Sequence, residues 1–408
     1  MAAAGNRRFA VSSAGLGVML AATDPRTREA ATTLPVYGQL PFVPQSATGC
    51  EIITADNRHI LDLYGGHAVA ALGYGHPALE QAIAEQSQTL LFQSNAVALD
   101  VRANAAEKLI AVAPENLQRV FFVNSGAEAN ENALRMACVA TGRSKILAIE
   151  HGFHGRTAAA AAVTWNSERW YGFAHKPFNV EFIKRDDCDD AIAKIGDDVA
   201  AVILEPVQGV AGAYDLSKEF LTTIRQQTES HDALLIADEV QSGIGRCGEF
   251  FAIQAHSLEP DIVTSAKALG GGIPCGAVLC TDSIAEHFGP GDLGSTFGGG
   301  PIAAAAIVSV IDSIAGEDLL ENVRARETQI RDTCITGPVR KIQGKGLLLG
   351  LVCDRPAVEV RDRLLEQDIL TGTSADANVL RILAPLVLRE EHVAQLARAL
   401  ADTTTFDS

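Results

Sequence analysis

The stretch LLIADEVQSGIGRCGEFFAIQAHSLEPDIVTSAKALGG, residues 234–271, points most directly to the fold class of this chain. It begins with an apolar run that ends at Asp238, and Gln241 follows three residues later. A second apolar run, 261–264, leads to Lys267 beside a cluster of glycines. Short runs that are apolar on both faces are typical of buried strands. The pattern therefore predicts two strands that deliver an acid and a lysine to one edge of a sheet.

An acid and a lysine at one sheet edge suit the chemistry of pyridoxal 5′-phosphate (PLP). This cofactor needs a carboxylate on its pyridinium nitrogen and a lysine that carries its aldehyde as a Schiff base. The alternative is that Asp238 caps a loop and Lys267 is a solvated surface charge, which is the usual fate of both residue types. The rest of the chain favours the first interpretation.

The same kind of apolar run recurs along the middle of the chain, at 119–123, 145–149, 199–204 and 277–280. Helical stretches separate most of these runs. Because parallel strands need helices over both faces, the pattern predicts an α/β fold with a mostly parallel sheet. Ligands of such sheets bind at the carboxyl ends of the strands.

An anion site is predicted where the run 119–123 meets the sequence NSGA, 124–127, and a helix. The first backbone N–H groups of a helix lack partners within the helix, and the helix dipole favours a phosphate there. Ser-Gly before a helix is also a common cap that binds no ligand. Phe153 and Glu205 follow predicted strands in the same way, so we expect them near Ser125.

Elements outside the central sheet predict a second domain. Turn chemistry at Asp56-Asn57 indicates a hairpin at 50–63. Apolar spacing predicts helices at 77–90 and 100–112, and a long helix at 302–314 that leads into the second domain. In that domain we expect strands at 346–352 and 379–383 and helices at 357–367 and 390–401.

The domain organisation follows from the order of these elements. We expect an N-terminal arm at 1–35 and a large cofactor-binding domain at 76–310. A small α+β domain is expected to combine the segment 36–75 with residues 311–408.

Composition narrows the partners and the compartment of this 408-residue chain. Its net charge of −17 disfavours nucleic acids and anionic membranes, which attract basic surfaces. Eight cysteines include no CxxC pair, so we expect reduced thiols, no metal site and a cytoplasmic protein. The sequence contains no run of eighteen apolar residues, so we expect no membrane span. The apolar segment 12–22 fits a signal peptide weakly, and an arm lying on a partner subunit fits better.

Seven motifs in order resemble the class III (ω-amino acid) aminotransferases of PLP fold type I, closest to the acetylornithine and acyl-lysine aminotransferases. The resemblance covers residues from Tyr37 to the C-terminus. The motifs are NSGAEANE at 124–131, HGFHGRT at 151–157, EPVQG at 205–209, DEVQSGIGRCG at 238–248, SAKALGGGIPCGA at 265–277, GSTFGGGP at 294–301 and VLRILAPL at 379–386. The resemblance implies a large domain with a mostly parallel sheet of about seven strands and a small α+β domain.

The resemblance implies roles for the residues around the cofactor ring. Asp238 would pair with the ring nitrogen, and Lys267 would hold the cofactor covalently and later move a proton. Gln241 would bind the ring hydroxyl, while Phe153 and Val240 would contact the ring.

The resemblance also implies a phosphate site and substrate contacts. Ser125, Gly126 and Ala127 would hold the phosphate together with Thr296, which would reach across from a second subunit of a homodimer. Arg156 would bind the distal carboxylate of the donor, and Arg381 the α-carboxylate of 2-oxoglutarate or glutamate, because a guanidinium matches a carboxylate bidentately. Glu205 and Ser295 would also lie near the substrate. His154 is expected to pack or hydrogen-bond, without a catalytic role.

The expected reaction is transfer of the terminal amino group of an N-acylated diamino acid, such as N-acetylornithine, to 2-oxoglutarate. The products would be a semialdehyde and glutamate. Alternatives are another ω-amine or diamine donor, a PLP aminomutase or decarboxylase, and a non-catalytic protein on the same scaffold. Val210 stands where related enzymes carry an acid after EPVQG, so we expect Arg381 to stay free of a partner.

Overall fold

The computed structural model describes residues 24–402 of the chain. Its largest sheet has seven strands in the order β4-β12-β11-β10-β7-β5-β6. Only β12 runs antiparallel to its neighbours, so the predicted α/β fold with a mostly parallel sheet is confirmed. The strands are β4 (Arg119–Val123), β5 (Lys145–Ile149), β6 (Asn179–Ile183), β7 (Val199–Leu204), β10 (Leu234–Asp238), β11 (Ile262–Ser265) and β12 (Gly276–Cys280).

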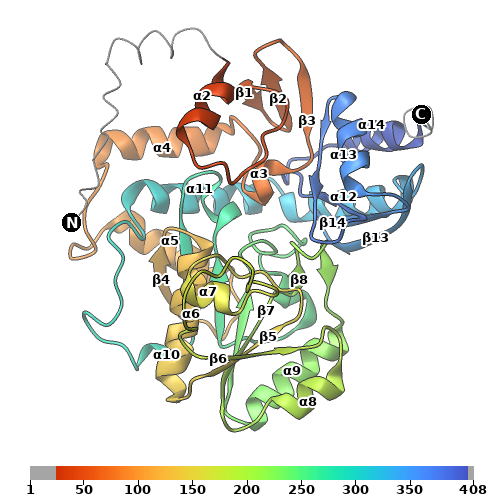
Figure 1. Ribbon diagram of the computed structural model, residues 1–408. Coiled ribbons are helices and arrows are strands. Elements are labelled where there is room, and N and C mark those ends of the chain that lie inside the picture. The colour runs from red at the N-terminus through yellow and green to blue at the C-terminus, as the bar shows by residue number, and fades with distance from the viewer. Residues whose placement is uncertain (1–23, 403–408) are drawn as a thin grey trace, which may run out of the picture.

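Helices cover both faces of this sheet (Figure 1). Successive side chains of a strand point to opposite faces, so Leu147 and Leu235 pack beneath α9 while Ile146 and Ile236 pack beneath α6. The helices are α2 (Pro25–Thr32), α3 (Gly65–Ala68), α4 (Pro77–Thr89), α5 (Asp100–Ala111), α6 (Gly126–Thr141), α7 (Ala158–Ala162), α8 (Cys188–Lys194), α9 (Lys218–Ser230), α10 (Asp282–Ala285), α11 (Pro301–Gly316), α12 (Leu319–Thr333), α13 (Ala357–Glu366) and α14 (Glu390–Ala401).

Two smaller sheets have four strands each. One, β1-β2-β3-β15, joins N-terminal strands to the C-terminal strand β15, with Leu61 opposite Ile369 in parallel register, and the other, β13-β14-β17-β16, contains C-terminal strands alone. Figure 1 shows the red and orange N-terminal strands beside the blue C-terminal elements. The bounds are β1 (Pro44–Thr48), β2 (Glu51–Thr54), β3 (His59–Asp62), β13 (Val339–Lys345), β14 (Leu348–Cys353), β15 (Ile369–Leu370), β16 (Gly372–Thr373) and β17 (Val379–Ile382), with a short pair β8 (Val207–Gln208) and β9 (Tyr214–Asp215).

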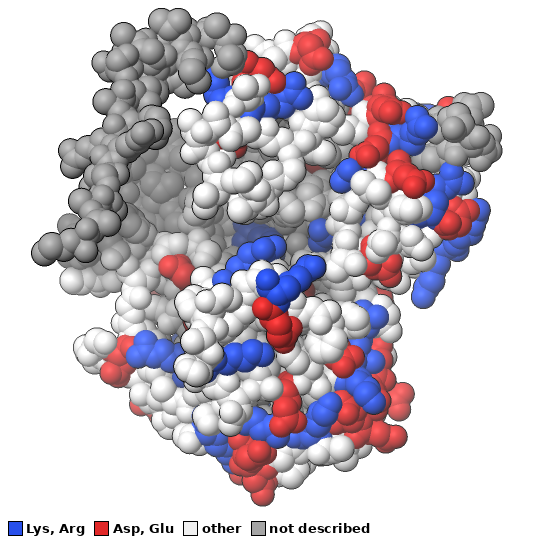
Figure 2. All heavy atoms as spheres, in the orientation of Figure 1, with Lys and Arg blue, Asp and Glu red and all other residues white. Residues whose placement is uncertain are grey.

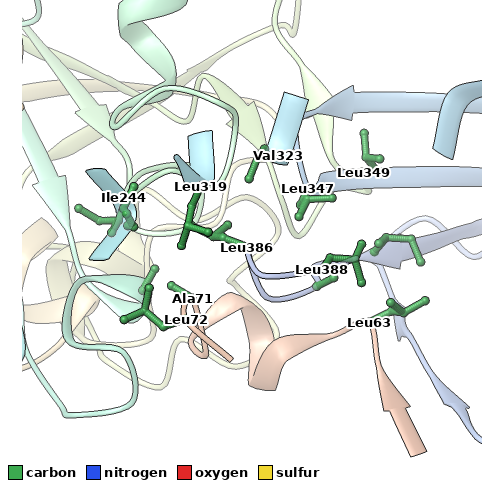
Figure 3. Packing of buried hydrophobic residues seen from close by; sticks show 14 of the residues in the cluster. Leu63, Ala71, Leu72, Ile244, Leu319, Val323, Leu347, Leu349, Leu386 and Leu388 are labelled. Atoms are coloured by element: carbon green, nitrogen blue, oxygen red, sulfur yellow. The ribbon is translucent and has the colours of Figure 1, made fainter. Parts of the chain in front are cut away.

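One hydrophobic core continues from the N-terminal segment into the C-terminal part. Leu63 and Leu72 belong to the same buried cluster as Leu386 and Leu388, and Ile244 joins it from the loop after β10 (Figure 3). The core also includes residues of 76–310, so it crosses the predicted boundaries, and the division at 36–75, 76–310 and 311–408 stays a prediction. The pairing of β3 with β15 fits the part of it that joins 36–75 to the C-terminal residues.

Most of the expected elements are present. The hairpin at 50–63 is formed by β2 and β3, and the helices expected at 77–90 and 302–314 are α4 and α11. The elements β6, α12 and β13 were not expected. For β6 the reason is its place at the sheet edge, where polar residues alternate with apolar ones.

The prediction of a buried strand at 119–123 was partly wrong, because β4 also lies at an edge of the sheet and its first residues are exposed or half-buried. The segment 12–22 lies outside the described residues. Of the predicted arm, α2 is described and buries none of its residues. Within residues 24–402, every helix is too short or too polar to cross a bilayer.

Candidate active site

A cavity of about 480 Å³ opens at the carboxyl edge of the central sheet. Figure 2 shows a hollow near the middle of one face of the molecule, with Lys and Arg atoms at its rim. The predicted site residues that line the cavity are Ser125, Gly126, Ala127, Phe153, Arg156, Glu205, Asp238, Val240, Gln241 and Lys267. Segments spread over more than 140 residues therefore meet as the sequence predicted.

Asp238 is the last residue of β10 and its side chain is buried. One carboxylate oxygen, Oδ2, accepts hydrogen bonds of 2.7 Å from Asn130 Nδ2 and of 2.7 Å from His154 Nδ1. The other oxygen, Oδ1, accepts one of 3.0 Å from the backbone N–H of Val240. Donors to both oxygens fix the orientation of the carboxylate at the cavity wall.

His154 is buried, and its Nδ1 donates to Asp238. Its Nε2 has no partner among the residues that the structure describes. The hydrogen bond to the carboxylate requires a proton on Nδ1. Asn130 was not singled out from the sequence, although it lies one turn after Gly126 in α6 and thus on the same side of the helix.

Lys267 follows β11 and begins a short 3₁₀ turn, Lys267–Gly270. Its φ of 47° is in the left-handed region, which residues other than glycine seldom adopt and which often marks a functional site. Burial lowers the pKa of the Lys267 ammonium, while the negative charges of Asp238 and Glu205 act in the opposite direction. A lowered pKa increases the share of neutral amine, the form that acts as a nucleophile.

The anion site predicted from the sequence would lie at the N-terminus of α6, which borders the cavity. Ser125 is the N-cap, and its hydroxyl accepts a hydrogen bond of 3.2 Å from the backbone N–H of Glu128. The backbone N–H groups of Gly126 and Ala127 have no acceptor within the helix and border the cavity. A Cβ on Gly126 would lie 2.6 Å from Val240 Cγ1, so glycine is needed for this close packing.

Glu205 is held on one wall of the cavity by backbone donors. Its Oε1 accepts from Phe153 N at 2.8 Å and its Oε2 from Gly209 N at 3.2 Å. Burial raises the pKa of Glu205 to about 7. Gln241 lies against the same loop, because a Cβ on Gly209 would be 1.8 Å from Gln241 Oε1.

Arg156 is exposed at the mouth of the cavity. Its guanidinium carbon lies 5.8 Å from the centre of the Phe153 ring and 5.2 Å from that of Trp170. A second hollow of about 700 Å³ shares Phe153, Arg156 and Val210 with the first and contains both tryptophans of the chain. Arg156 thus stands where the two hollows meet.

Three predicted site residues do not line the cavity. Arg381 is buried beside it, with Nη1 at 3.5 Å from Gln241 Oε1. Ser295 contacts the phosphate-site segment of its own chain, since its Oγ accepts from Asn124 Nδ2 at 3.1 Å. Thr296 is exposed.

The expectation that Arg381 stays free was wrong. Its guanidinium donates to the backbone oxygens of Thr373 and Gly209 and to the phenol oxygen of Tyr64. The reason is that β16 and the N-terminal segment surround the guanidinium with neutral acceptors. The hydrogen bond between Tyr64 and Arg381 joins residues 317 positions apart, which no local pattern predicts.

Comparisons with known proteins agree with this geometry. The family model described as class-III aminotransferase matches residues 34–404. The acetylornithine aminotransferase of Corynebacterium efficiens is 39% identical over 385 residues, covering 90% of this chain and 94% of the relative.

Two solved structures resemble this fold closely. The N-acetylornithine aminotransferase of Stenotrophomonas maltophilia has a TM-score of 0.78 and 30% identity, covering 91% of this chain and 97% of that one. The ornithine aminotransferase of Toxoplasma gondii, whose active site is described with partial occupancy of PLP, has a TM-score of 0.86 and 26% identity over 93% of this chain and 94% of that one. The match over residues 34–404 shows that this chain belongs to the class-III aminotransferase family, as its motifs predicted.

Proposed function

We propose that the cavity binds PLP and that the protein moves the terminal amino group of an N-acylated diamino acid, such as N-acetylornithine, to 2-oxoglutarate. The observation that carries this proposal is the meeting of three groups in one cavity: the buried carboxylate of Asp238, the lysine Lys267 and the free N–H groups at the start of α6. These groups fit a cationic ring nitrogen, an aldehyde and a phosphate. The similarity to acetylornithine aminotransferases over 90% of the chain supports the donor class.

When bound, PLP supplies an electron sink for the carbanion that forms at the amine-bearing carbon. The residues of the chain do the rest. Asp238, oriented by Asn130 and His154, would pair with the ring nitrogen and favour its protonated form. Lys267 would accept the proton from the amine-bearing carbon and return it to the cofactor carbon that receives the nitrogen. Phe153 and Val240 border the space for the ring.

In this proposal, two guanidinium groups bind the carboxylates of the substrates. Arg156 at the cavity mouth suits the distal carboxylate of the donor, and Arg381, deeper in the protein, suits the α-carboxylate of glutamate or 2-oxoglutarate. The amine donor and the keto acid that accepts the amino group would then occupy the same cavity one after the other, which corresponds to ping-pong kinetics.

The test is a panel of amine donors, including N-acetylornithine, ornithine and simple diamines, incubated with 2-oxoglutarate. We expect one glutamate for each amine consumed, with the highest kcat/KM for an N-acylated diamino acid. Release of carbon dioxide, or a rearranged amine without glutamate, would contradict the proposal in favour of a decarboxylase or an aminomutase.

We also propose a homodimer with shared active sites. Exposed apolar side chains lie within and beside the GSTFGGGP segment: Phe297 of the segment is 64% exposed, and its ring is 5.3 Å from that of Phe92, which is 42% exposed and follows Leu91, 66% exposed. Neighbouring exposed apolar side chains of this size commonly mark a protein interface. A second copy of the chain would cover them.

Thr296→Ala should weaken cofactor retention about 3- to 10-fold, because one hydroxyl donor to the phosphate would be lost. The measurement is the PLP content after dialysis at a fixed protein concentration. Ser283→Ala is the control, since Ser283 hydrogen-bonds only Thr281 at the surface. A catalytically active monomer saturated with PLP in sedimentation experiments would contradict the shared site.

Val210→Glu should lower kcat/KM for glutamate relative to that for the ω-amine donor. The expected change in the difference between the two activation free energies is about 1.5–3 kcal/mol, the strength of a hydrogen bond to a charged group. Val210 lines the cavity next to Gly209, whose carbonyl already binds Arg381 at 3.2 Å. A carboxylate there would pair with Arg381 and compete with the substrate. Val210→Gln is the uncharged control, and an unchanged ratio in the Glu variant would show that the two side chains do not meet.

The composition supports the remaining part of the proposal. All eight cysteines are free thiols, which fits a cytoplasmic enzyme. The net charge of −17 disfavours nucleic acid and anionic membranes as partners, because both attract basic surfaces.

A further inference from the structure

Arg381 is bound by an unusual set of acceptors, all of them neutral. Nε donates to Thr373 O at 2.8 Å, Nη1 to Gly209 O at 3.2 Å and to Gln241 Oε1 at 3.5 Å, and Nη2 to Tyr64 Oη at 3.1 Å. Within residues 24–402, no carboxylate lies within 4 Å of this guanidinium. A guanidinium has five N–H groups, and these acceptors engage four of them. The fifth N–H, together with the N–H in the long and weak contact with Gln241, remains for a ligand.

Tyr64 does not end this chain of hydrogen bonds. Its phenol oxygen is 2.7 Å from His67 Nδ1. While the oxygen accepts from Arg381, the phenol proton can be donated to His67 Nδ1 when that nitrogen is unprotonated. Burial and the positive charges of Arg381 and Lys267 lower the pKa of His67, which favours that form.

The backbone is built to hold this pair. Gly65, Gly66, His67 and Ala68 have φ values of 54°, 58°, 65° and 65°, a left-handed turn that is strained for the last two residues. The turn brings His67 back over the ring of Tyr64, with ring centres 4.6 Å apart.

The Tyr64 ring is also in close contact with Gly372 of β16. A Cβ on Gly372 would lie 1.9 Å from Tyr64 Cε2, so only glycine leaves space for the ring. Gly372 is paired with Arg381 in the ladder between β16 and β17. Tyr64 is therefore enclosed between the N-terminal turn and the strand next to the arginine that it binds.

We propose that Tyr64 and His67 are positioning residues that hold Arg381 through an uncharged hydrogen-bond chain and thereby set the selectivity for α-carboxylates. A carboxylate partner would neutralise the guanidinium and would have to be displaced by each incoming α-carboxylate. The tyrosine fixes the guanidinium in place and leaves its charge for the substrate. This inference rests on the proposed function, in which Arg381 takes the α-carboxylate of glutamate and 2-oxoglutarate.

The test uses Tyr64→Phe, which keeps the ring and removes only the oxygen. For the holoenzyme, we expect the Kd of glutarate, an unreactive dicarboxylate, to rise roughly 10-fold, the effect of losing one hydrogen bond to a charged group. The KM of glutamate should rise by a similar factor with kcat within about twofold, and kcat/KM for the ω-amine donor should stay nearly constant.

Two substitutions at position 67 test the second link. His67→Ala removes the acceptor and should raise the Kd of glutarate about 3-fold, whereas His67→Asn keeps an acceptor near the place of Nδ1, tolerates the left-handed backbone and should restore it. Tyr64→Phe combined with His67→Ala should bind glutarate no more weakly than Tyr64→Phe alone, because both act through one oxygen.

Tyr214→Phe is the matched control, since the Tyr214 phenol donates to Asp186 Oδ2 at 2.8 Å and, within the described residues, has no hydrogen bond to Arg381 or Tyr64. It should leave the glutarate Kd unchanged. An unchanged Kd in Tyr64→Phe, or an equal rise in Tyr214→Phe, would overturn the inference. The Kd decides this independently of turnover, so an absence of glutamate formation by the wild-type protein would count against the proposed function alone.

Discussion

Replacing Lys267 with Ala should reduce the overall rate of amino transfer by roughly 10⁴-fold, the upper end for a positioned proton carrier. Lys267 is the only lysine that lines the cavity among the residues that the structure describes, and its backbone has a strained φ of 47°. Without it, the amine that binds the cofactor aldehyde and the base that moves the proton are lost together. The measurement is glutamate formed per enzyme over long incubation.

Cofactor binding separates this result from simple unfolding. The N-terminus of α6 is intact in Lys267→Ala, so PLP should still bind through its phosphate, but denaturation should release all of it unattached. Lys341→Ala, at an exposed position of β13, is the control and should behave as wild type. A Lys267→Ala protein that turned over at the wild-type rate would refute the PLP assignment.

The second large effect is expected for Asp238→Asn, which should lower kcat by about 10²- to 10³-fold while PLP is retained. An amide cannot keep the ring nitrogen protonated. It also cannot satisfy the donors around it: with its oxygen toward Asn130 and His154, its NH₂ group faces the N–H of Val240. The variant should therefore also lose about 1–3 kcal/mol of unfolding free energy.

The rate loss must be distinguished from this loss of stability. Asp261→Asn removes a carboxylate that accepts from Arg225 at 2.7 Å and from the backbone of Leu235, at the other end of the neighbouring strands. It should destabilise the protein comparably and leave kcat unchanged. If Asp238→Asn kept the wild-type kcat, the carboxylate would have no part in the chemistry.

Local pattern was sufficient for the parts of the site that follow directly from a strand or begin a helix. Asp238, Lys267 and Glu205 each end an apolar run, and Ser125 stands between a strand and a helix. In a parallel sheet such positions converge at one edge, so their meeting in one cavity was predictable before any coordinates. The order of motifs also identified the family.

Pattern failed where an element's character depends on its neighbours. The edge strand β6 and the helix α12 carry mixed polar sequences that look like loops until the sheet or the C-terminal core covers one side. The reversed direction of β12 is likewise invisible in its sequence, because a strand buried on both faces is apolar in either direction.

The partners of Arg381 were decided only by the tertiary structure. The sequence prediction left Arg381 without an acceptor, because it considered only position 210, where valine stands in place of the acid of related enzymes. Tyr64 reaches Arg381 because β3 pairs with β15 and the left-handed turn at 65–68 carries the N-terminal segment over β16. Sequence periodicity reports which side of an element is buried, whereas a hydrogen bond between residues more than 300 positions apart depends on how all the intervening elements pack.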